Sequence, residues 1–189
     1  MSEKEPNKQT LVALVENKPG VLNRVVSLFR RRNYNMDSLT VGRTHKPHIS
    51  RMTIVVDANR ANGRQIATNL YKLINVIDVK LVSNEPYVSR DLALIKVRTD
   101  DADSYNAVAE ICERSQARIV DMGQKFAIVE IAAREEQVEE VIRQLSEIGI
   151  VELVRTGVVA MGRGTRIMDT DYEPPVFSSN GLNGQRFGV

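Results

Sequence analysis

Residues 11–32 read LVALVENKPGVLNRVVSLFRRR, and this stretch decides the fold. Its first five residues are an uninterrupted apolar run of strand length, and Pro19-Gly20 marks a tight turn. The three arginines at its end are favourable beside the free carbonyl groups of a last helical turn. Between turn and arginines, apolar side chains recur at the spacing of one helix face, at Val21, Leu22, Val25, Leu28 and Phe29. The stretch therefore predicts a buried strand, a turn and an amphipathic helix.

The start of this helix has the properties of a small anion-binding site. Gly20, Val21 and Leu22 are predicted to present backbone N–H groups that lack an acceptor inside the helix. The helix dipole adds partial positive charge, and the glycine leaves room for a carboxylate. Most strand–turn–helix junctions bind no ligand, so the residues alone leave both a ligand site and a plain turn open.

The composition is that of an ordinary globular protein. The chain has 189 residues, a length that suits one large domain or two small ones. Of these residues, 42% are hydrophobic and 26% are charged, as in most globular proteins. The net charge of +2 does not indicate binding to nucleic acid or to membranes. Cys112 is the only cysteine, so no internal disulfide is possible. No signal peptide or membrane span is visible, and we expect a cytoplasmic protein.

Residues 9–83 are predicted to form one βαββαβ unit. Strands are expected at 38–42, 51–56 and 76–82, and the polar residues 44–48 are expected to connect the first two of these. The apolar face of a second helix is assigned to Ile66, Leu70, Leu73 and Ile74.

Residues 91–168 repeat this order after a linker at 84–90. Strands are expected at 92–97, 118–120, 126–131 and 150–154. One helix begins near Asp103, and Gly149 ends another whose apolar stripe is Val138, Val141, Ile142 and Leu145. The fold class is therefore α+β, with two tandem ferredoxin-like (βαββαβ) sandwiches. Because each sheet keeps an uncovered face, a homodimer is expected.

The two ends of the chain have a different composition. Residues 1–8 are polar, and residues 169–189 are rich in glycine, proline and serine, which is typical of a flexible tail. The apolar residues 158–161 fit either a final strand or a docking segment, with the strand favoured.

Nothing in the sequence has the pattern of a catalytic or metal site. His45 and His48 lie in a polar turn without a third ligand nearby, so a solvated turn is predicted. Cys112 lies on an apolar helix stripe, where a thiol is part of the core. Asp100, Asp101 and Asp103 fit a helix cap better than a catalytic carboxylate pair.

Several motifs, in order, resemble the small subunit of acetolactate (acetohydroxyacid) synthase, whose first unit is an ACT domain. The resemblance covers about residues 9–168. Its motifs are LVENKPGVL at 14–22, YNMDSLTV at 34–41, SRMTI at 50–54, LINV at 73–76, RDLALIKV at 90–97 and ELVRTG at 152–157.

The resemblance implies a regulatory subunit that has no active site of its own. It would activate a catalytic large subunit that joins two pyruvates into 2-acetolactate and carbon dioxide, in the pathway to valine, leucine and isoleucine. Thiamine diphosphate, Mg²⁺ and FAD would belong to that partner, and this chain would bind no cofactor. The chain would also confer feedback inhibition by valine. The alternative is a stand-alone ACT-type amino-acid-binding regulator without a catalytic partner.

In the family, valine lies between the ACT domains of two protomers. The matching positions here are Asn17, Gly20, Val21 and Leu22 from one copy and Asn35 from the other, with Gly42 and Gln65 as further pocket positions. Asn17 and Asn35 offer amide oxygens for the ammonium group of the ligand. From the residues alone, an Asx turn for Asn17 and an ordinary turn for Asn35 would be favoured over a ligand contact. No catalytic residue and no metal ligand is implied.

Overall fold

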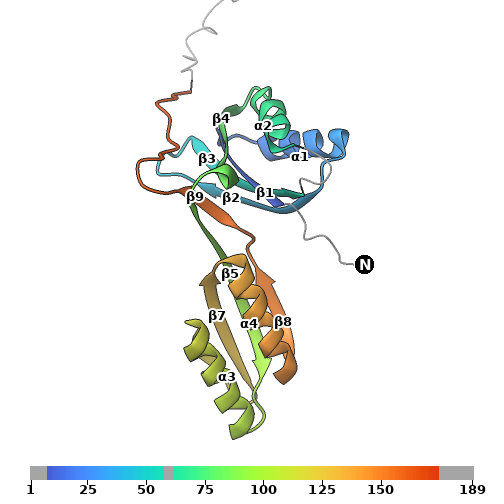
Figure 1. Cartoon of the computed structure of the whole chain (residues 1–189), viewed down its shortest axis with the longest axis vertical. Coiled ribbons are helices and arrows are strands. Elements are labelled where there is room, and N and C mark those ends of the chain that lie inside the picture. The colour runs from blue at the N-terminus through green and yellow to red at the C-terminus, as the bar shows by residue number, and fades with distance from the viewer. Residues whose placement is uncertain (1–7, 58–61, 175–189) are drawn as a thin grey trace, which may run out of the picture.

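The first unit is a four-stranded antiparallel sheet with two helices on one face (Figure 1). The computed structural model describes residues 8–57 and 62–174 of the chain. The strand order is β2-β3-β1-β4, so β1 is central and β2 is an edge. The elements are β1 (Lys8–Glu16), α1 (Val21–Arg32), β2 (Met36–Arg43), β3 (Ile49–Asp57), α2 (Gly63–Tyr71) and β4 (Val76–Leu81).

Strand β1 is buried on both faces, which explains its unbroken apolar run. Leu11, Ala13 and Val15 belong to the core beneath α1 and α2. The alternate side chains, Val12 and Leu14, are also buried, although they point to the face that the helices do not cover.

Two residues assigned to apolar helix faces lie outside the core. Leu22 is in α1, yet 45% of it is exposed. Ile74 is 86% exposed because α2 ends at Tyr71, and the chain then turns with the Val76 N–H donating to the Leu73 carbonyl. Leu22 lies in the first turn of α1 and Ile74 lies just beyond the end of α2. At both positions the apolar spacing of the sequence continues, but the side chain no longer packs against the core.

The second unit repeats the architecture, with its sheet in the order β6-β7-β5-β8. This confirms the predicted pair of βαββαβ units. A short 3₁₀ turn at Val82–Asn84 precedes the unit. No helix in the described ranges is long and apolar enough to cross a membrane. The elements are β5 (Tyr87–Arg98), α3 (Ala102–Ser115), β6 (Arg118–Met122), β7 (Phe126–Ala133), α4 (Glu135–Ile148), β8 (Ile150–Arg155) and β9 (Val159–Gly162).

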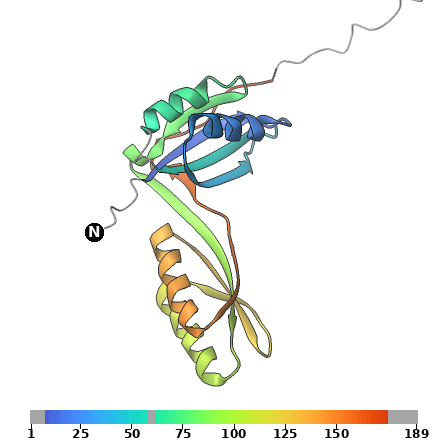
Figure 2. The ribbon, with the colours of Figure 1, turned by 90° about the vertical axis from the view of Figure 1, so that its right-hand side faces the viewer.

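The linker predicted at 84–90 is largely a strand. Tyr87–Arg90 is the first third of β5, which runs from one unit to the other (Figure 2). This part of β5 pairs antiparallel with β9, from Tyr87 opposite Gly162 to Arg90 opposite Val159. The pairing satisfies backbone groups that a free linker would leave to water. Residues 158–161 therefore supply the final strand, as favoured from the sequence.

Strand β9 and the chain that follows it lie against the face of the first sheet that is turned away from the helices (Figure 1). Ala160 packs with Val12 and Val82 in a small second core. Within the predicted tail at 169–189, residues 169–174 lack regular structure and contact the first unit through Thr170 and Tyr172. Residues 175–189 lie outside the described ranges. The face expected to need a second copy is thus covered in part by the chain itself.

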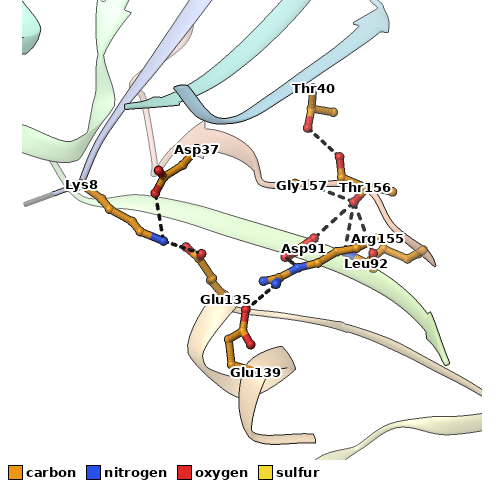
Figure 3. Close-up of polar contacts among 10 residues, drawn as sticks. All are labelled: Lys8, Asp37, Thr40, Asp91, Leu92, Glu135, Glu139, Arg155, Thr156 and Gly157. Atoms are coloured by element: carbon orange, nitrogen blue, oxygen red, sulfur yellow. Dashed lines mark hydrogen bonds and ion pairs between the residues drawn. The ribbon is translucent and has the colours of Figure 1, made fainter. Parts of the chain in front are cut away.

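The two units meet through polar side chains (Figure 3). Lys8 Nζ lies 2.8 Å from a carboxylate oxygen of Glu135 and 3.2 Å from one of Asp37. The Glu135 carboxylate raises the pKa of Lys8 through their hydrogen bond. Close by, the Thr40 hydroxyl donates to the Thr156 carbonyl over 3.3 Å. The units are therefore tied by a few directional contacts.

Candidate functional site

The turn between β1 and α1 is tied to the neighbouring β2–β3 connection by Asn17. Its backbone N–H donates to the His48 carbonyl at 2.7 Å, and its side-chain Nδ2 donates to the Pro47 carbonyl at 2.9 Å. The Asn17 side chain thus links the β1–α1 turn to the β2–β3 connection. It does not form the Asx turn that the sequence offered as the alternative. Because Nδ2 is the donor, the amide oxygen stays available to accept from a ligand.

Gly20 occupies a conformation and a space that suit ligand approach. Its φ of 82° is left-handed, and a Cβ placed there would meet no atom within 4 Å. The first amides of α1 are only partly free. The Val21 N–H donates to the Lys18 carbonyl at a long 3.4 Å, whereas the Leu22 N–H has no acceptor in the described part of the chain.

A buried carboxylate, Glu16, lies directly before this turn. It accepts hydrogen bonds from the Tyr172 hydroxyl, from Lys18 Nζ at 2.9 Å and from Asn75 Nδ2. These donors, the tyrosine hydroxyl first, lower the pKa of Glu16 to about 2. Arg24 in α1 donates to the other amide atom of Asn75, so the network reaches the helix as well.

Sequence reasoning missed this network. A glutamate at the end of an apolar strand gives no sign of its partners, because Asn75 and Tyr172 are 59 and 156 residues away along the chain. The single usable signal is the alternation of β1, which puts Glu16 on the same face as Val12 and Leu14. That face is buried because Val82, Tyr87, Ala160 of β9 and Met168 pack against it.

The remaining predicted site residues do not gather at Gly20 within one chain. Asn35 is exposed beyond the far end of α1, a helix of 12 residues or about 18 Å. Its carbonyl accepts from the Asp57 N–H at 3.3 Å. Gln65 is exposed in the first turn of α2, whereas Gly42 lies on edge strand β2, opposite Arg51. One chain thus contributes two separate halves of the predicted pocket.

The arrangement offers binding groups and no reacting ones. No group of three or more possible metal ligands occurs in the residues that the structure describes. The predicted solvated turn is wrong for His48, whose Nε2 lies 3.0 Å from the Tyr172 carbonyl oxygen. Burial raises the pKa of the Cys112 thiol, which keeps it protonated and unreactive.

Comparisons with known proteins match both units. Residues 11–78 match the family model of the AHAS small subunit-like ACT domain, and residues 90–164 match that of the small subunit of acetolactate synthase. The Archaeoglobus fulgidus probable acetolactate synthase small subunit is 43% identical over 84% of this chain and 99% of its own length. The Mycolicibacterium smegmatis acetolactate synthase small subunit is 44% identical over 83% of this chain and 92% of its own.

A solved structure gives the same assignment. The crystal structure of the Thermotoga maritima acetolactate synthase small subunit has a TM-score of 0.76 and 35% identity, and covers 84% of this chain and 98% of its own. Sequence and fold thus agree over both units, from β1 to β9. This chain belongs to the family of acetolactate synthase small subunits.

Proposed function

We propose that this chain is the regulatory subunit of an acetolactate synthase and acts in the cytoplasm. It binds the catalytic large subunit, raises its turnover of pyruvate and makes that turnover sensitive to valine. The observation that supports this most is the match of both units to small-subunit models, together with an open helix start at Gly20. Thiamine diphosphate, Mg²⁺ and FAD are assigned to the large subunit, which carries out the chemistry.

Valine is proposed to bind where the β1–α1 turn of one copy faces Asn35 of a second copy. The Leu22 amide and the helix dipole receive the carboxylate, and the Asn17 amide oxygen accepts from the ammonium group. Gly20 leaves the approach open. Because the two halves of the pocket lie far apart in one chain, a bound valine fixes how two copies sit against each other.

The Glu16 network supports a route from this turn to the rest of the molecule. Glu16 adjoins Asn17 in the chain and holds the Tyr172 hydroxyl. A shift of the turn on valine binding therefore acts on the segment that covers the first sheet. Inhibition requires valine to bind one arrangement more tightly than another, and a coupling of ~1–3 kcal/mol is typical of such regulation.

Reconstitution with a large subunit tests the proposal. The large subunit is titrated with this chain, and pyruvate consumption is followed with and without valine. We expect activity to rise to saturation and valine to lower it, while this chain alone turns over neither pyruvate nor an acyl phosphate. A chain that binds valine but neither binds nor activates the large subunit would be a stand-alone regulator instead.

A further inference from the structure

Strand β2 of the first unit meets the chain that follows β8 of the second (Figure 3). The Thr40 hydroxyl in β2 donates to the Thr156 carbonyl, and Gly157 lies against the same strand. We define the contact of Ser38 and Thr40 with Thr156 and Gly157 as the joint. Because β2 is the edge strand of its sheet, no neighbouring strand of the described chain holds its outer side.

Position 157 in the joint requires a glycine. Its φ of 83° is left-handed. A Cβ built there would lie 3.1 Å from the Ser38 Cβ and 3.2 Å from the Thr40 Oγ1, which is closer than ordinary van der Waals contact. The backbone of the second unit thus passes β2 as closely as the side chains of that strand allow. A movement of β2 here either displaces Gly157 or breaks the contact.

The second unit fixes its own side of the joint. The Thr156 N–H donates to the Leu92 carbonyl at 3.0 Å, and the Leu92 N–H donates to the Thr156 hydroxyl at 3.2 Å. The preceding residue, Arg155, pairs with Asp91 of β5 and with Glu139 of α4. A displacement at Thr156 is therefore carried to an inner strand and to a helix of the second unit.

The contact across the joint is only weakly stabilised. Ser38 Oγ is buried and has no hydrogen-bond partner among the described residues, which is a cost of keeping the units in contact. The register of β2 is irregular between Met36 and Ser38, where Asp37 is the extra residue. The nearby ion pair between the units joins Lys8 to Glu135, whose side chains are 35% and 32% exposed, and such pairs contribute little. A ligand that acts on β2 can therefore change this contact.

Strand β2 also carries one half of the predicted valine pocket. Asn35 directly precedes the strand, and Gly42 is its next-to-last residue. Ser38 and Thr40 lie between these two positions. Thr40 and Gly42 share the sheet face that is turned away from the helices. A ligand bound at either end of β2 thus acts on the strand that forms the joint.

We propose that the joint couples valine binding at β2 to the position of the second unit, because Thr156 and Gly157 follow a shift of that strand. The inference rests on the proposed function and assigns a route for its regulation. The Glu16 network begins at the β1–α1 turn, which belongs to the other half of the pocket. Variants in the joint therefore test this route without touching that network.

Gly157→Ala tests the joint, and Gly164→Ala is its matched control. Both glycines are left-handed, with φ of 83° and 63°, but a Cβ at Gly164 would meet no atom within 4 Å. Hydrogen–deuterium exchange of the full chain is measured with and without valine. In the wild type and the control, we expect valine to change exchange in β2, in residues 150–157 and in α4. In Gly157→Ala, we expect the change to stop at the first unit.

Valine inhibition of the reconstituted enzyme is the second measurement. We expect Gly157→Ala to bind valine within about threefold of the wild type by calorimetry, while the fraction of activity that saturating valine removes falls about twofold or more. Thr40→Val removes the hydroxyl that bonds to Thr156 and is expected to weaken inhibition as well. If Gly157→Ala has a lower thermal midpoint than Gly164→Ala, the result for Thr40→Val decides.

Three results would overturn the proposal. Full valine inhibition in both folded joint variants would show that the contact transmits nothing. Equal loss of inhibition in Gly164→Ala would assign the effect to left-handed backbone strain. A wild-type exchange response confined to the first unit would show that valine binding does not reach the second. Failure of the proposed function looks different, because the wild-type chain would then show no exchange response to valine anywhere and no activation of the large subunit.

Discussion

Gly20 is the residue whose conformation and position both bear on the proposed binding of valine. With φ at 82° and open space where a Cβ would be, Gly20→Asp is expected to fold, at a cost of about 1 kcal/mol for the left-handed backbone. Its carboxylate repels that of valine and fills the approach. We expect valine inhibition of the reconstituted enzyme to be lost while activation persists.

The control for this variant is Gly20→Ala, which strains the backbone but adds no charge. Inhibition by valine is measured for both variants at saturating amounts of each. An unaltered valine response in Gly20→Asp would remove this turn from the site. Equal loss in both variants would assign the effect to backbone strain.

Glu16 makes the stability of the first unit depend on acidity. Its pKa is about 2 in the folded chain against an ordinary 4.5, because the charged form accepts three hydrogen bonds. The stabilisation is therefore complete above pH 4.5 and disappears as the pH falls towards 2. We expect Glu16→Gln to lower the free energy of unfolding by about 1–3 kcal/mol at neutral pH.

Urea unfolding of the wild type and Glu16→Gln between pH 7 and pH 2 measures this effect. The two curves of stability against pH should converge as the pH falls below 4.5. Curves that stay parallel down to pH 2 would show that Glu16 keeps an ordinary pKa in the folded chain.

At the scale of elements, strand β1 and the segment from β9 to Tyr172 depend on each other. Val12, Leu14 and Glu16 alternate along one face of β1 and are all buried. Ala160 contacts the first of these, and Tyr172 bonds to the last. The segment therefore follows β1 from Val12 to Glu16 and reaches the proposed effector turn.

Tyr172→Phe tests whether this contact transmits the valine signal. The variant keeps the ring and removes the hydroxyl that contributes most to lowering the pKa of Glu16. We expect a carbon-13 NMR titration to show the Glu16 pKa raised towards its ordinary value. We also expect the valine concentration for half-inhibition to change.

Tyr105→Phe, in α3 of the second unit, is a matched loss of one hydroxyl. It is expected to leave the valine response unchanged. If Tyr172→Phe raises the pKa of Glu16 but leaves the valine response unaltered, the hydrogen bond between Tyr172 and Glu16 has only a structural role.

At the scale of the whole molecule, Asp91 fixes the start of the second unit close to where the units meet (Figure 3). Its side chain is 1% exposed and pairs with Arg155 across β5 and β8. Arg155 also pairs with Glu139 of α4. We expect Asp91→Asn to destabilise the chain by about 2–4 kcal/mol, because it leaves a partly buried guanidinium with one partner fewer.

Glu139→Gln is the control, since it breaks the exposed half of the same network and should cost under about 1 kcal/mol. Both are measured by urea unfolding with a probe for each unit. Equal losses in the two variants would show that burial adds nothing to the Asp91 pair.

The sequence predicted the repeating elements well because each depends on local patterns. The apolar run of β1, the turn at Gly20 and the spacing in α1 determine that strand, turn and helix with little help from distant residues. The predictions from sequence were wrong where tertiary packing decides whether a residue is buried or a segment forms a strand. Leu22 and Ile74 continue an apolar spacing that the core does not reach, and the predicted linker at 84–90 gains strand structure only by pairing with β9.

By itself the sequence determined the two βαββαβ units, the family and the open turn at Gly20, since these follow from periodicity and contiguous motifs. Tertiary structure alone decided that the chain from β9 onward covers the first sheet and that Glu16 meets Tyr172. The physical reason is that these contacts join segments more than 40 residues apart in the chain. They lie on the face of the first sheet that α1 and α2 do not cover, so no local sequence pattern specifies them. Composition predicted a flexible tail for residues 169–174, because their contacts are with a surface that exists only after folding.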